Sequence, residues 1–346
     1  LNITPQTSPS SPRFNVFNLI YLRIDMGGFN LYADFTAKKD IPIEKSKYGM
    51  LELQDANSVI RDAAQRPDPK MLYKELWYEG EVSCLFADTN SGKSLLAVQI
   101  GTEIAKTEKV LYLDLELSDK QFQLRYSDEG VLYEFPLNFY RVSIDRMSIP
   151  EGDFEESIMK DIETMVDKTG AKVLIIDNLT WLCTQSEKGS DASVLMRRLL
   201  NLKFKYGLSM LCVAHTPKRN MCAPITQNDL AGSKRLINFF DSSFAIGVSA
   251  KDEALRYLKQ IKCRYGSFTY DSGNVIVCHI EKINSFTSFV IDGYSNESEH
   301  LKQPSDKDTE ELAAKVKELV SSGRSYRDVA QTLGISHSKV QRIIKK

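Results

Sequence analysis

A segment of eight residues, Ala87-Asp88-Thr89-Asn90-Ser91-Gly92-Lys93-Ser94, has the composition and spacing of a phosphate-binding loop. It follows an apolar run and departs from the pattern Gly-x-x-x-x-Gly-Lys-Ser/Thr only at Ala87, which stands at the first glycine. Such a loop points backbone N–H groups at phosphate oxygens, and the helix that follows adds a favourable dipole. Lys93 would reach the β- and γ-phosphates, and Ser94 would place its hydroxyl on Mg²⁺. The segment predicts a site for ATP and Mg²⁺, with an ordinary strand-turn-helix as the alternative.

Hydrolysis at such a loop also needs a carboxylate for the metal, a group that activates water and positive charge at the γ-phosphate. Asp177 ends the apolar run VLIID and is expected to hold Mg²⁺; capping a turn with Asn178 is the alternative. Glu116 ends the run VLYLDLE and is expected to be the base that activates water. Asp114 lies two residues earlier, on the same side of a strand, and is the alternative base.

His215 ends a third apolar run, SMLCVAH, where a strand would deliver its last side chain to the same edge of a sheet. A lone histidine is more often structural than functional. This one is nevertheless expected to contact or sense the γ-phosphate, because of its place at the strand end.

The elements that must position these residues follow a regular order along the chain. Apolar runs at 81–87, 110–116, 172–178 and 209–215 alternate with helical stretches that begin at Lys93, near 151 and at Asp191. Continuous apolar strands separated by amphipathic helices are typical of a parallel sheet covered on both faces. Later runs at 242–249, 255–264, 274–281 and 288–293 lack long helices between them. The sequence therefore predicts an α/β fold whose mostly parallel sheet ends in an antiparallel extension.

Roughly residues 50–293 resemble the RecA-like ATPases, in the branch of hexameric replicative helicases of the DnaB and RepA type. The resemblance is carried by LDLELSDKQFQLRY (113–126), MLCVAHTPKRN (210–220) and DLAGSKRLINFFDSSFAIGV (229–248). By position it implies Glu116 as the base, with Gln121 and Arg125 on the next helix, and it implies assembly into a homo-oligomeric ring, hexameric in that branch.

The stretch LKQIKCRYG places Lys262 and Arg264 two residues apart, so both would point to one face of a strand. The resemblance implies that these side chains reach the γ-phosphate bound by a neighbouring subunit. A solvated basic strand that discourages edge pairing is the alternative.

Two loops, 179–192 and 216–229, follow the strands that end at Asp177 and His215. In the family they would face the channel of the ring. Lys218 and Arg219 in the second loop are suited to the phosphates of single-stranded DNA. A lid that does not touch DNA is the alternative.

The C-terminal residues 308–346 have the spacing of a helix-turn-helix, with helices expected at 308–321, 325–333 and 336–345. From 321 to 346 there are six basic residues against one acid, a net charge of +5, which favours duplex DNA over a protein-docking bundle. Ser325 and Ser336 are plausible N-caps. The candidate DNA contacts are Arg327, His337, Ser338, Lys339, Gln341 and Arg342.

The composition limits the remaining possibilities. With 45 Lys and Arg against 46 Asp and Glu, the 346 residues are not a uniformly basic coat protein. No apolar run is long enough for a membrane span and no export signal is recognisable, so a cytoplasmic protein is expected. Six scattered cysteines predict buried thiols rather than disulfides or a zinc site.

The expected organisation is a partly disordered extension (1–49), an ATPase domain (50–294), a linker (295–307) and a helix-turn-helix domain (308–346). The expected function is that of an ATP-hydrolysing DNA helicase or replication-initiation ATPase, and the resemblance alone suggests a plasmid, phage or mobile element. A DNA-bound regulatory switch and a recombination mediator, both without unwinding activity, are the alternatives.

Overall fold

The computed structural model describes residues 45–149, 154–184, 192–217, 219–230, 236–303 and 306–345. The chain divides into two compact units, Leu1–Pro67 and Asp68–Lys346. In the first unit, strands β1 (Ser46–Tyr48) and β2 (Leu51–Leu53) form an antiparallel pair, and helix α1 (Ala56–Ala64) follows. The described residues up to Pro67 belong to the first unit.

The second unit contains a mixed sheet whose strand order is β15-β14-β13-β12-β5-β11-β10-β6-β9. Its parallel part is made of strands that belong to successive strand-helix repeats, and their bounds are β5 Val82–Ala87, β6 Val110–Asp114, β9 Phe139–Ser143, β10 Val173–Asp177, β11 Ser209–His215 and β12 Ser242–Val248. The antiparallel part is β13 (Leu255–Lys262), β14 (Val275–Ile283) and β15 (Phe286–Ser295). The predicted α/β class with an antiparallel extension is confirmed.

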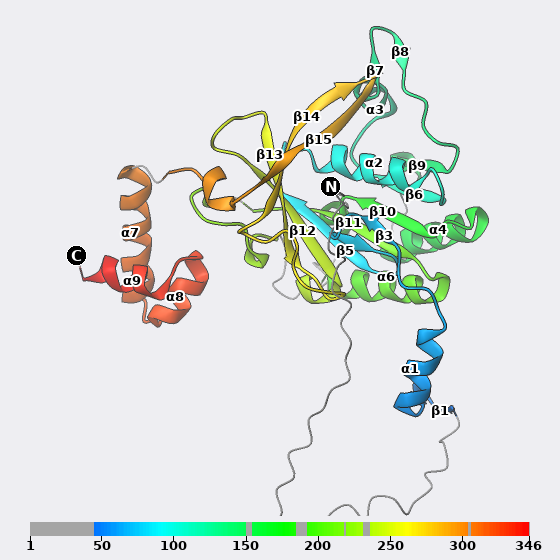
Figure 1. Cartoon of the computed structure of the whole chain (residues 1–346), viewed down its shortest axis with the longest axis horizontal. Coiled ribbons are helices and arrows are strands. Elements are labelled where there is room, and N and C mark those ends of the chain that lie inside the picture. Colours follow the sequence, from blue (N-terminus) through cyan, green and yellow to red (C-terminus); the bar gives the residue numbers. More distant parts are fainter. Residues whose placement is uncertain are drawn as a thin grey trace, which may run out of the picture. The chain divides into compact units, whose positions relative to one another are not determined.

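The sheet is covered on both faces because its central strands are apolar on both faces. Every residue of β5 is buried. Its Cys84 and Phe86 pack in one core cluster with helices α4 (Phe154–Thr169) and α6 (Ser193–Tyr206). Leu85 packs in the other cluster with α2 (Lys93–Ile104). Figure 1 shows α2 on one side of the sheet and α4 and α6 on the other.

Short elements complete the second unit. The pairs β3 (Met71–Tyr73) with β4 (Trp77–Tyr78) and β7 (Ser127–Asp128) with β8 (Val131–Leu132) are antiparallel. Helix α3 (Asp119–Arg125) begins at a capping box in which Ser118 and Gln121 cap each other, and α5 (Leu179–Thr184) follows β10. None of the described helices is both long and apolar enough to cross a membrane.

The segment predicted as a linker at 295–307 is packed at its beginning. A short 3₁₀ helix spans Glu297–His300, and the side chain of Glu297 is only 1% exposed. Its carboxylate pairs with Lys259 Nζ at 2.6 Å, and the ring of His300 contacts the hydroxyl of Ser249 at 2.8 Å. These buried contacts place residues 297–300 with the sheet, so any linker starts later than predicted.

The C-terminal residues form three mutually packed helices, α7 (Asp306–Ser321), α8 (Tyr326–Leu333) and α9 (His337–Ile344). The side chains of Ser325 and Ser336 accept hydrogen bonds from the first turns of α8 and α9, as predicted. Gly334, with φ +61°, ends α8 in a left-handed conformation that glycine adopts readily. The buried core of this helical unit is Val316, Val329, Ala330 and Val340.

Candidate functional site

A pocket of about 500 Å³ opens at the carboxyl edge of the parallel strands. The register of the sheet explains why it is there: His215 of β11 pairs with Ala87 of β5, and Asp177 of β10 pairs with Asp114 of β6, so neighbouring strands end together. The residues that line the pocket come from the β5–α2 loop, the ends of β6, β10 and β11, helix α3 and the β14–β15 hairpin. They are Thr89, Asn90, Gly92, Lys93, Ser94, Leu95, Glu116, Leu124, Arg125, Asp177, His215, Lys282 and Thr287.

The β5–α2 loop has the strand-loop-helix context that the sequence predicts. Gly92 has φ +97°, a conformation that side chains disfavour. A Cβ atom at this position would also lie 2.8 Å from the ring of Phe289 and 2.9 Å from Cδ1 of Ile280. Glycine is therefore required at position 92 both by the backbone conformation and by the β14–β15 hairpin packed against it.

Lys93 is held inside the loop. Its ammonium group donates hydrogen bonds to the carbonyl oxygens of Ala87 at 3.0 Å and Asp88 at 2.9 Å. Burial lowers the pKa of Lys93, and the nearby charges of Asp177 and Glu116 oppose that shift. A polyphosphate bound in the pocket would favour the charged form of Lys93, as the two acids do.

The side-chain oxygen atoms of Asp177 and Ser94 are the candidate ligands for Mg²⁺ in this pocket. The hydroxyl groups of Ser94 and Tyr112 both hydrogen-bond the Asp177 carboxylate, and the Tyr112 bond is 2.7 Å long. Burial raises the pKa of Asp177, and the charges of Glu116 and Asp114 raise it further. A cation would relieve this penalty, because it favours the ionised carboxylate.

Within the described part of the chain, no group of three or more His, Cys, Asp or Glu side chains could hold a metal ion by itself. Mg²⁺ keeps several waters and is usually bound by one or two carboxylates together with substrate phosphates. The pair of Ser94 and Asp177 therefore fits the predicted ion as part of a nucleotide site, not as a separate metal centre.

Glu116 and His215 are joined through Asn178. The amide nitrogen Nδ2 of Asn178 donates to Oε1 of Glu116 and lies 3.1 Å from Nε2 of His215. The Asn178 oxygen accepts the backbone N–H of Trp181 at 2.7 Å, which fixes the orientation of the amide. Nε2 of His215 also lies 3.5 Å from Oε1 of Glu116.

From the sequence, Asn178 is expected only as a turn partner of Asp177, without a functional role. The one available signal was its place directly after the strand-ending aspartate. The structure shows that this position brings a buried amide, 2% exposed, between the proposed base and the proposed sensor. Asn178 is therefore a site residue that the sequence analysis missed.

The contacts of Asp114 and Glu116 favour Glu116 as the base. Asp114 is 2% exposed, and its carboxylate pairs with Nε of Arg141 at 2.9 Å. It also accepts the backbone N–H of Leu117 at 2.9 Å. Glu116 instead lines the pocket with a side chain that is 44% exposed. Asp114 orders the turn after β6, and Glu116 is the better candidate to meet a water molecule.

Lys262 and Arg264 do not line this pocket. The register pairs Lys262 with Ser243, and Ser242 with Ser83, so these cations lie near the amino ends of the parallel strands, at the opposite edge of the sheet. Lys262 donates to the carbonyls of Ile237 and Phe240 at 2.9 and 2.7 Å, and Arg264 pairs with Asp241 at 2.7 Å. Neither can serve the site of its own subunit.

Arg219 is placed differently from the expectation. Its side chain is only 5% exposed, its Nε pairs with Asp88 of the loop at 3.2 Å, and its Nη1 donates to the carbonyl of Ala223 at 3.1 Å. A buried guanidinium with these partners is not available to DNA phosphates, so this predicted contact is withdrawn. Lys218 lies outside the described residues.

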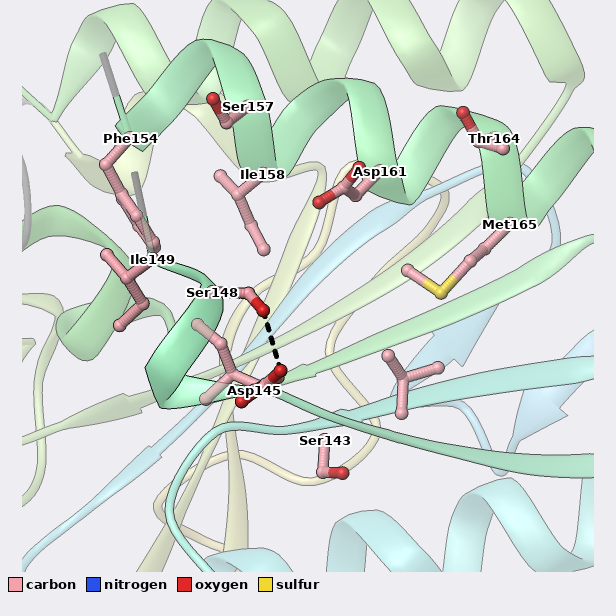
Figure 2. A pocket seen from close by; sticks show the side chains of 12 residues that line it. Ser143, Asp145, Ser148, Ile149, Phe154, Ser157, Ile158, Asp161, Thr164 and Met165 are labelled. Carbon is pink, nitrogen blue, oxygen red and sulfur yellow. Dashed lines mark hydrogen bonds between the residues drawn. The ribbon is translucent and has the colours of Figure 1, made fainter. Parts of the chain in front are cut away.

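A separate pocket of about 370 Å³ lies between the end of β9 and helix α4. Figure 2 shows Ile158 and Met165 pointing from α4 into this pocket, and Asp145 accepting a hydrogen bond of 2.7 Å from Ser148 on the other side. None of the predicted site residues lines it. The chemistry predicted from the sequence therefore belongs to the pocket at the strand ends.

The predicted contacts in the helical unit lie mostly at its surface. The side chains of Arg327, His337, Ser338, Gln341 and Arg342 are exposed, and that of Lys339 is partly exposed. Val340 of the same helix is fully buried in the core. Helix α9 thus presents a polar and basic face while its apolar face packs on α7 and α8.

The part of the chain that contains the phosphate-binding loop is similar to known proteins. A family model described as an AAA domain, AAA_25, matches residues 50–221, just under half of the chain. The DNA repair protein RadA of Streptococcus pneumoniae is 24% identical over 208 residues, which cover 57% of this chain and 44% of that protein. RadA of Aquifex aeolicus is 25% identical over 190 residues, which cover 55% of this chain and 38% of that protein. The chain thus spans less than half the length of these relatives.

Among solved structures, a KaiC-like protein from Pyrococcus horikoshii is similar with a TM-score of 0.47 and 14% identity, covering 62% of this chain and 91% of that one. The family match includes the loop, Glu116, Asp177 and His215. Lys282 and Thr287, which also line the pocket, lie beyond the matched residues.

Proposed function

We propose that this protein is an ATP-hydrolysing, Mg²⁺-dependent RecA-like ATPase that acts on DNA. The observation that carries the proposal is the meeting of Lys93, Glu116, Asp177 and His215 in one pocket with the phosphate-binding loop. The match to an AAA domain supports nucleotide use. The relatives from Streptococcus pneumoniae and Aquifex aeolicus are named DNA repair proteins, which supports an action on DNA.

Each group has a defined task in this proposal. The loop N–H groups and Lys93 bind the β- and γ-phosphates, while Ser94 and Asp177 hold Mg²⁺, which supplies positive charge to the phosphate oxygens when it is bound. Glu116 orients and deprotonates the attacking water. His215 contacts the γ-phosphate, and Asn178 keeps the carboxylate and the ring in fixed positions relative to each other.

Replacing the proposed base tests the chemistry. Glu116→Gln keeps the size and the hydrogen bond to Asn178 but cannot accept a proton, so ATP turnover is expected to fall about 10²- to 10⁴-fold. Binding of ATP, measured by titration calorimetry, is expected to persist. Glu103→Gln, an exposed carboxylate on α2, is the matched control and should turn over like the parent. Equal turnover by the parent and Glu116→Gln would remove Glu116 from the mechanism.

We further propose that the active form is a homo-oligomeric ring, a hexamer, in which Lys262 and Arg264 act on the neighbouring subunit's site. Both residues lie near the amino ends of the parallel strands, opposite the pocket, so the proposal has them act on a nucleotide bound by another subunit. A cation at that edge lies away from the proposed nucleotide site of its own chain.

Mixing two inactive variants tests this arrangement. Glu116→Gln lacks the base, and the double variant Lys262→Gln, Arg264→Gln lacks the reaching cations, so each should hydrolyse ATP poorly by itself. In mixed rings, a site with intact Glu116 can face intact cations from its neighbour, and ATPase activity should return. Activity that stays at the sum of the two separate variants would contradict action between subunits.

We propose that α9 binds duplex DNA, and the exposed Arg342 is the side chain to test. Arg342→Gln is expected to weaken duplex binding about tenfold, the size of one good arginine contact. The control is Lys315→Gln, an exposed cation on α7, which should change affinity less than twofold. Fluorescence anisotropy over a range of salt concentrations measures both. Equal affinities for the parent and Arg342→Gln would exclude α9 as the binding face.

We also propose that the ring separates DNA strands, with single-stranded DNA in its channel. A forked duplex incubated with ATP should be unwound by the parent and not by Lys93→Ala, which loses the loop cation. The relatives are named DNA repair proteins, which also supports a role in DNA repair. ATP turnover without strand separation would therefore support a DNA-bound switch, and long nucleoprotein filaments would support a recombination mediator.

A further inference from the structure

The pocket contains two cations that the proposed mechanism does not yet use. Arg125 ends helix α3 and Lys282 lies near the end of β14, and both line the pocket with the phosphate-binding loop. They are separated by more than 150 residues of chain, so the fold alone brings them together. The resemblance to helicases implied a place for Arg125 on the helix but nothing for Lys282.

The charge balance of the pocket favours an anion. Its lining contains three basic side chains, Lys93, Arg125 and Lys282, against the two carboxylates of Glu116 and Asp177. Within the described residues, neither Arg125 nor Lys282 forms an ion pair with a carboxylate. The two acids of the pocket have other partners: Asp177 binds two hydroxyl groups, and Glu116 is bonded to Asn178. The positive charge of α3 and β14 is therefore not neutralised within this site.

The β14–β15 hairpin contacts the end of α3 and the strand that follows it. The side chain of Lys282 donates to the carbonyl of Ser127 at 2.9 Å, and the hydroxyl of Thr287 donates to the carbonyl of Arg125 at 3.2 Å. The ring of Phe286 packs on that of Tyr126, with centroids 5.2 Å apart. The hairpin and the end of α3 thus form one corner of the pocket, and Figure 1 shows the hairpin extending beside α3 and β7.

The same hairpin is fastened to the helix that carries the loop. The side chain of Gln99, on α2, donates to the carbonyl of Phe289 at 3.1 Å and accepts its N–H at 2.7 Å. At the start of α2, Gly92 packs directly against the Phe289 ring. The loop and the corner that carries Arg125 and Lys282 are therefore positioned relative to each other by direct contacts, as a preorganised anion site requires.

We propose that Arg125 and Lys282 bind the polyphosphate of the nucleotide within the same subunit and make the pocket select a nucleoside triphosphate over a diphosphate. The inference rests on the proposed nucleotide site and deepens it. It follows from Coulomb attraction, since a ligand with more negative charge gains more from two added cations in a partly enclosed pocket. Unlike Lys262 and Arg264, these residues need no neighbouring subunit to reach the site.

The test measures binding and does not depend on turnover. Arg125→Gln and Lys282→Gln are titrated with ATP-γ-S and with ADP, in the presence of Mg²⁺ and at protein concentrations where sedimentation shows a monomer. Each variant is expected to raise the Kd of ATP-γ-S about tenfold or more, the effect of one lost charged hydrogen bond. The Kd of ADP is expected to rise less. Arg125→Lys and Lys282→Arg keep the charge and should restore most of the affinity.

The control is Lys251→Gln, which removes an exposed cation paired with Glu299, away from the pocket. It should leave both dissociation constants unchanged, and a thermal unfolding scan of each variant checks that the fold is retained. Variants that bind ATP-γ-S like the parent, or that lose ATP-γ-S and ADP affinity equally, would overturn the inference. A parent protein that binds neither nucleotide would instead overturn the proposed function itself.

Discussion

The arrangement of the site depends on one constraint, the in-register parallel pairing of β6, β10, β11 and β5. Parallel strands in register end at a common edge, so the last side chains of successive repeats meet there although they are far apart in the chain. A slip of one strand by one residue would turn each of its side chains to the other face of the sheet, and the polar side chains at the strand ends would no longer meet.

Much of this could be predicted from the sequence for the same reason. Strands buried on both faces appear as continuous apolar runs, and β5, β10 and β11 were located within one residue of their observed ends. Strand β9 was missed because it lies at the edge of the sheet and none of its five residues is fully buried. Its sequence, FYRVS, consequently lacks the apolar continuity that marked the others.

The parts of the site that escaped prediction are those that depend on contacts between distant segments. The role of Asn178 could not be predicted from the sequence, because it depends on β6 and β11 bringing Glu116 and His215 to its amide. Lys282 stands in an ordinary strand pattern, and only the packing of the β14–β15 hairpin on α2 and α3 brings it to the pocket. Arg219 was misjudged because loop residues are usually exposed, whereas this one is buried against Asp88.

The bridge between Asp88 and Arg219 has a consequence for how this protein can vary. Loss of Asp88 would leave the guanidinium of Arg219, which is 5% exposed, without an opposite charge. Removing one partner of a buried ion pair commonly costs about 3–5 kcal/mol of stability. Loss of both together costs far less. Viable substitutions at these two places should hence come as matched exchanges, which ties the composition of the phosphate-binding loop to that of a segment more than a hundred residues downstream.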